Sequence, residues 1–68
     1  PQAVGGYHHR GPRLELAPGE KRRRPLPSLD TGQATIYNQR FAAQGRTDYH
    51  AATRVLDGQP YLYLWRDA

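Results

Sequence analysis

The sequence predicts a small β fold, a three-stranded antiparallel meander that follows an extended basic N-terminal arm. Five of the six prolines lie within residues 1–27. Proline fixes φ and removes a backbone donor, so this part of the chain is expected to stay extended. From residue 33 onward, β-branched and aromatic residues alternate with turn signals, which is typical of short strands. We therefore divide the chain into an arm, 1–32, and a small folded unit, 33–68.

The three expected strands lie at 34–43, 49–56 and 61–65. The last is the clearest, because aromatic residues and leucines alternate strictly along it. Asp57-Gly58 before it is a strong hairpin-turn signal. Neighbouring side chains in a strand point to opposite faces, so the aromatic side chains and the leucines cannot all enter one core. One face of this strand is therefore expected to be available to a partner.

An α+β version of the fold is possible if residues 31–44 are helical. Asp30 or Thr31 would then be the N-cap, and Gly45 would follow the last turn, where a positive φ is favoured. In this version Thr47 or Asp48 could cap a short second helix that ends before Gly58. The last strand is expected in both versions.

The folded unit is small. Residues 33–68 fall below the roughly 40 residues under which a domain usually needs a disulfide, a metal or an oligomer, and the chain has no cysteine. We therefore expect a homo-oligomer, a place in a larger complex, or packing of the arm back onto the fold. Four leucines of the arm could make that contact: Leu14, Leu16, Leu26 and Leu29.

The charge pattern favours an anionic partner. The net charge is +4, the sequence pI is about 10.0, and nine of the ten basic residues are arginine. Arginine contacts phosphate bidentately and stacks on bases, although a GC-rich genome would also enrich it. Most of the basic residues lie in the arm, including a run of four at 21–24. The residues predicted to bind nucleic acid are Arg10, Arg13, Lys21, Arg22, Arg23, Arg24 and Arg40.

The aromatic residues of the last strand form a second candidate site. Tyr61, Tyr63 and Trp65 are assigned to a protein interface, because the folded unit has few aliphatic residues and needs a partner. The alternative is base stacking, since aromatic rings beside arginines form platforms for single-stranded nucleic acid.

Catalytic, metal and membrane functions are not expected. The sequence has no Gly-rich phosphate loop, no nucleophile beside a base and no paired carboxylates at a useful spacing. His8, His9 and His50 do not complete a tetrahedral ligand set. We expect no enzyme activity, no cofactor and no metal. No apolar run approaches the roughly 20 residues that span a bilayer.

These observations favour a small, basic, non-catalytic binding protein, nucleic-acid-binding or regulatory, of the kind that plasmids and phages encode. One alternative is a structural or accessory subunit of a virion or multi-subunit complex, with the arm threaded along neighbouring subunits. A second is a small inhibitor that docks on a host protein by strand pairing. The choice among DNA, RNA and protein stays open. We expect a soluble chain, intracellular or virion-associated.

Overall fold

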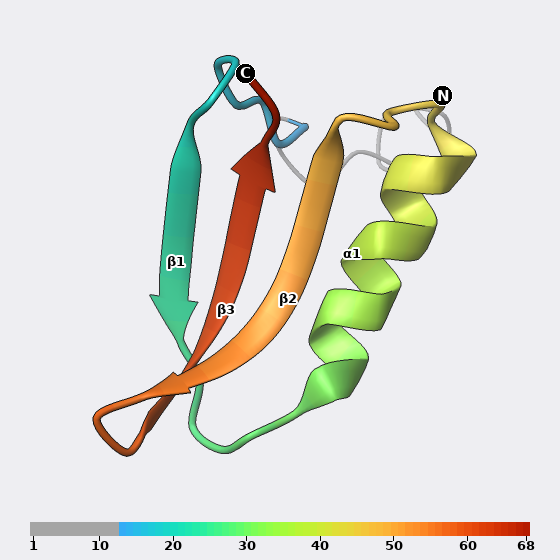
Figure 1. Ribbon diagram of the computed structural model, residues 1–68. Coiled ribbons are helices and arrows are strands. Elements are labelled where there is room, and N and C mark those ends of the chain that lie inside the picture. Colours follow the sequence, from blue (N-terminus) through green and yellow to red (C-terminus); the bar gives the residue numbers. More distant parts are fainter. Residues whose placement is uncertain (1–12) are drawn as a thin grey trace, which may run out of the picture.

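The computed structural model describes residues 13–68 and shows a small α+β fold, an open antiparallel sheet with one helix on one side (Figure 1). The elements, in chain order, are β1 (Lys21–Pro25), α1 (Thr31–Ala43), β2 (Tyr49–Leu56) and β3 (Gln59–Arg66). The strand order across the sheet is β1-β3-β2, so the last strand lies in the centre. The described helix is too short and too polar to cross a membrane.

The helix confirms the α+β version of the predicted fold and corrects the meander. Segment 34–43, predicted as a strand from its β-branched and aromatic residues, is helical. Asp30 caps the helix through Oδ1, which accepts a 2.9 Å hydrogen bond from the amide of Gly32. Gly45 follows the last turn with φ 71°, a conformation that glycine adopts without steric cost. Ala34 and Phe41 are buried on the side that faces the sheet.

The β2–β3 hairpin follows the prediction for the end of the chain. Residues 49–56 form a strand, so no second helix begins after Thr47. Asp57 and Gly58 have φ values of 51° and 78°. Two successive left-handed residues match the right-handed twist of the flanking strands, which explains the Asp-Gly pair.

The third strand comes from the segment predicted as a free arm. β1 pairs antiparallel with β3, from Lys21 opposite Trp65 to Pro25 opposite Tyr61. The meander is therefore wrong in its connectivity: it would place 34–43 beside 49–56, whereas the third strand is β1 and lies on the other side of the hairpin, beside β3.

Two side chains make hydrogen bonds to backbone groups of the sheet that have no partner on a neighbouring strand. Pro60 in the central strand has no N–H, and the Gln59 side-chain amide donates instead to the carbonyl of Leu26, at 2.9 Å. On the outer edge of β2, Asn38 of α1 bonds both the N–H and the C=O of Ala51, at 2.9 Å each. Asn38 thus acts as a short substitute for a further strand.

The core lies between α1 and the sheet. Its buried residues are Leu16, Leu26, Ala34, Phe41, Tyr49, Ala51 and Leu62. Leu62 is only 1% exposed, and burial of a leucine stabilises a fold by about 1.5–3 kcal/mol. Leu14 packs against this core as well, whereas Leu29 is 58% exposed.

The described part of the arm therefore packs back onto the fold through three of its four leucines. The predicted boundary at residue 33 falls inside α1, two residues after the helix begins. The arm up to residue 12, including Arg10, His8 and His9, lies outside the described residues.

Candidate functional site

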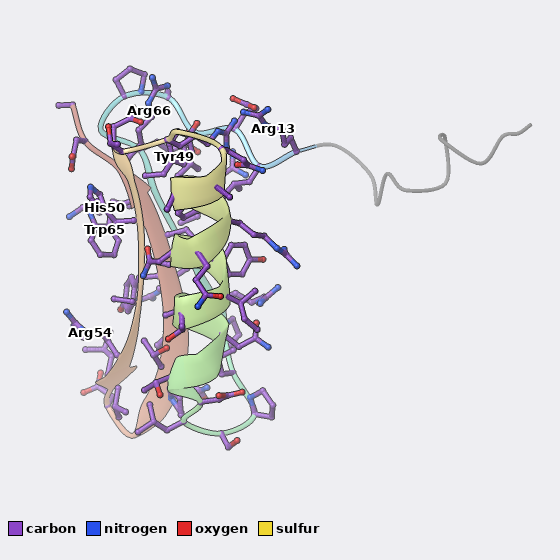
Figure 2. All side chains as sticks on the ribbon, turned by 90° about the vertical axis from the view of Figure 1, so that its right-hand side faces the viewer. Arg13, Tyr49, His50, Arg54, Trp65 and Arg66 are labelled. Atoms are coloured by element: carbon purple, nitrogen blue, oxygen red, sulfur yellow. The ribbon has the colours of Figure 1, made fainter. Side chains whose placement is uncertain are left out.

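The face of the sheet opposite α1 carries the aromatic side chains of β3. Leu62 is buried and Leu64 packs against the core. Tyr61, Tyr63 and Trp65, which alternate with these leucines, therefore point away from the helix and are half-buried. Figure 2 shows Trp65 on this side, together with residues of β2.

The pairing register places cations on both sides of this aromatic row. Residues directly opposite each other on paired strands share a face of the sheet. In β1, Lys21 lies opposite Trp65 and Arg23 lies opposite Tyr63. In β2, Arg54 lies opposite Tyr61. We call this surface the open face; its residues are Lys21, Arg23, His50, Ala52, Arg54, Tyr61, Tyr63 and Trp65.

The open face is basic because the three strands contain no aspartate or glutamate. Lys21, Arg23 and Arg54 are all exposed. The nearest carboxylate contact is at one end, where Asp67 Oδ2 lies 2.9 Å from His50 Nε2. A positive surface of this kind attracts anions.

Arg23 covers part of the aromatic row. Its guanidinium carbon lies 4.5 Å from the centroid of the Tyr61 ring, and its Nη1 donates a long, 3.5 Å hydrogen bond to the Tyr63 hydroxyl. That hydrogen bond raises the pKa of Arg23 above its usual value. Tyr61 and Tyr63 also contact each other, with ring centroids 6.0 Å apart. One face of Tyr61 is thus already occupied by a cation.

His50 covers part of Trp65 at the other end of the row. The two rings stack with their centroids 5.4 Å apart and an interplanar angle of 28°. Figure 2 shows both rings side by side, on the side of the sheet away from α1. The contact with Asp67 holds the imidazole in this position.

Between these two covered rings lies a shallow pocket of about 270 Å³. Its lining residues are Lys21, Ala52, Arg54, Tyr63 and Trp65. Ala52 forms part of its wall because its methyl group is the smallest side chain on this face of β2, where its neighbours are His50 and Arg54. The pocket therefore combines two aromatic rings with a cation from each outer strand.

The structure brings together only part of the predicted nucleic-acid site. Strand alternation divides the basic run at 21–24, so that Arg22 and Arg24 lie opposite Leu64 and Leu62, on the other side of the sheet. Arg22 makes an ion pair with Glu20, at 2.8 Å.

The two other described arginines of the predicted set also lie away from the open face. Arg13 lies 3.5 Å from Glu15 in an exposed ion pair. Arg40 lies on α1, 5.8 Å from the centroid of the Tyr37 ring.

Three residues of the open face were in neither of the two predicted sites, the nucleic-acid site and the protein interface. They are His50, Ala52 and Arg54, all on β2. The alternation of 49–56 would group them on one face. The Asp57-Gly58 turn would show that this face is the aromatic one, because a two-residue hairpin loop fixes which residues of the two strands lie opposite each other.

The residues that the structure describes hold no cluster of three or more metal-ligating side chains. Comparisons with protein-family models, with curated proteins and with solved structures find no match to this chain.

Proposed function

We propose that this chain is a small non-catalytic protein that binds nucleic acid on the open face of its sheet. One observation carries the proposal: three aromatic side chains stand in a row on the sheet face that α1 does not cover, with basic side chains on the strands at both sides. This reassigns Tyr61, Tyr63 and Trp65 from a protein interface to a nucleic-acid interface. A role in regulation, as in small plasmid or phage proteins, remains part of the proposal.

The two kinds of side chain have separate tasks. Lys21, Arg23 and Arg54 are exposed and contact phosphates, which positions the ligand without reading its sequence. The rings contact bases, whose planar faces stack on aromatic side chains with little sequence preference. Together they fit a ligand with regularly spaced negative charges and apolar planar groups.

A protein partner is the second candidate, and a separate observation favours it. Val55 and Leu56 are 54% and 44% exposed at the end of β2, next to the hairpin turn. These two residues are adjacent in the strand, so their side chains point to opposite faces of the sheet, and each exposes apolar surface that a protein contact would bury. They suit the structural-subunit and inhibitor hypotheses, and they lie at the end of the sheet farthest from Trp65.

Two double variants, each of which loses two positive charges, test the proposal. Lys21→Ala with Arg23→Ala removes two cations from the open face, whereas Arg22→Ala with Arg24→Ala removes two from the opposite side of the same strand. Binding of labelled DNA and RNA is measured by fluorescence anisotropy from about 50 to about 200 mM salt, over which phosphate contacts weaken steeply. Circular dichroism confirms that each variant is folded.

Three phosphate contacts on a single strand give a slope of about −2 in a plot of log K against log salt, so a fourfold rise in salt weakens binding about 20-fold. The open-face variant should lower the magnitude of the slope by about 1.4, and the control variant should not. Equal effects of the two variants would contradict an open-face site. Absence of binding by the wild-type chain at low salt would refute the proposed function.

A further inference from the structure

The open face is not uniform, and it contains a hollow. The Arg23 guanidinium covers one side of the Tyr61 ring, and the His50 imidazole covers one side of the Trp65 ring. The space between them is the pocket at Ala52, where the surfaces of Tyr63 and Trp65 remain accessible. A planar ligand group can reach the aromatic row here without displacing either covering side chain.

We propose, on the basis of the proposed function, that the ligand is a single strand and that one unstacked base enters the pocket at Ala52. The base stacks against Trp65 and Tyr63. Its flanking phosphates lie beside Lys21 on β1 and Arg54 on β2, so the strand crosses the sheet obliquely rather than following β3.

The spacing of the aromatic side chains requires an unstacked strand. Residues two apart along a β-strand are about 6.8 Å apart, about twice the 3.4 Å rise per nucleotide of a stacked strand. Bases in a duplex are covered by their neighbours on both faces, so they cannot stack on a ring of the protein. Recognition of a duplex instead uses an element that enters a groove, whereas the open face belongs to a sheet.

The size of the pocket fits one base. Its volume of about 270 Å³ is below the roughly 300–1,000 Å³ of sites for drug-sized ligands. Ala52 decides this volume, because a larger side chain at this position would fill the space between His50 and Arg54. The two cations of the pocket come from opposite edges of the sheet, which gives each neighbouring phosphate its own partner.

Trp65 makes a direct test possible, since it is the only tryptophan in the chain. Its fluorescence is followed during titration with strands of about eight nucleotides, within the roughly 4–16 nucleotides of known single-strand sites. Separate titrations use DNA, RNA and the corresponding duplex. The variant Ala52→Leu fills the pocket, and Ala43→Leu, at an exposed position of α1, makes the same chemical change away from it. Ala52→Val, which suits a strand, replaces Ala52→Leu if the latter fails to fold.

Single strands of DNA, RNA or both should quench Trp65 saturably, and the duplex should bind more weakly. Ala52→Leu should weaken single-strand binding roughly 5- to 150-fold, the contribution of one stacked base, while Ala43→Leu binds as the wild type. Equal binding of single strand and duplex with unchanged Trp65 fluorescence would overturn the pocket and leave the proposed function intact.

Two further outcomes would also overturn the inference. Absence of binding to any nucleic acid would refute the proposed function together with it. A dimer of the wild-type chain that Ala52→Leu dissociates in sedimentation would show that a second copy covers the pocket.

Discussion

One buried hydroxyl, that of Tyr49, contributes to the attachment of the segment around Leu16 to the sheet, and Tyr49→Phe removes it. Tyr49 is 6% exposed at the start of β2. Its hydroxyl accepts a 3.0 Å hydrogen bond from the amide of Leu16 and donates a 3.3 Å one to the carbonyl of the same residue. The ring packs against Phe41, with centroids 5.3 Å apart. Phenylalanine preserves this packing and loses only the two hydrogen bonds.

The loss of stability depends on which hydrogen bonds the amide and the carbonyl of Leu16 keep in the variant. The carbonyl still accepts a 2.9 Å hydrogen bond from Arg66 Nη1, whereas the buried amide loses Tyr49. An unpaired buried donor costs about 1–3 kcal/mol. With a urea m-value of about 1 kcal/mol/M for a domain this small, the unfolding midpoint should fall by about 1–3 M.

Urea unfolding, monitored by Trp65 fluorescence, measures this midpoint. Hydrogen exchange of the Leu16 amide reports directly on its hydrogen bond to the Tyr49 hydroxyl. Tyr37→Phe is the control, because it removes a hydroxyl from a half-buried tyrosine of α1 and should change stability by less than about 0.5 kcal/mol. If both variants unfold at the same urea concentration and Leu16 exchanges as in the wild type, the Tyr49 hydroxyl does not hold the segment.

Two further predictions concern carboxylates. Asp30→Ala removes the N-cap of α1 and should lower the free energy of unfolding by about 0.5–2 kcal/mol in urea; an unchanged midpoint would mean that the cap is dispensable. The hydrogen bond from Arg66 lowers the pKa of Asp48 in the folded chain, so the unfolded chain binds this proton at higher pH. Stability should therefore fall as the pH drops from about 3.9 through the lowered pKa. Asp48→Asn should flatten this acid dependence in thermal melts. A part of it should remain, because the Ala17 amide and Arg22 likewise lower the pKa of Glu20. Identical acid profiles for variant and wild type would contradict the assignment to Asp48.

Local signals in the sequence predicted the hairpin and misassigned the helix. Asp57-Gly58 and the alternation at 61–65 depend only on neighbouring residues, so they can be recognised without knowledge of the rest of the fold. In 34–43, β-branched and aromatic residues favoured a strand. The structure places Ile36, 48% exposed, outside the core, so its preference for strands had no packing to support it. The cap at Asp30 was the better indicator, because it satisfies helix amides that a strand would not leave open.

The sequence by itself determined that the aromatic side chains and the leucines of the last strand face opposite ways, because alternation is intrinsic to an extended backbone. It also determined that the chain is basic and that residues 33–68 contain few aliphatic residues for a core. Only the tertiary structure decided that Lys21 and Arg23 share the aromatic face, because the pairing of β1 with β3 joins residues that are 36 to 44 positions apart in the chain. That register is set by backbone hydrogen bonds and core packing, since no short turn connects the two strands.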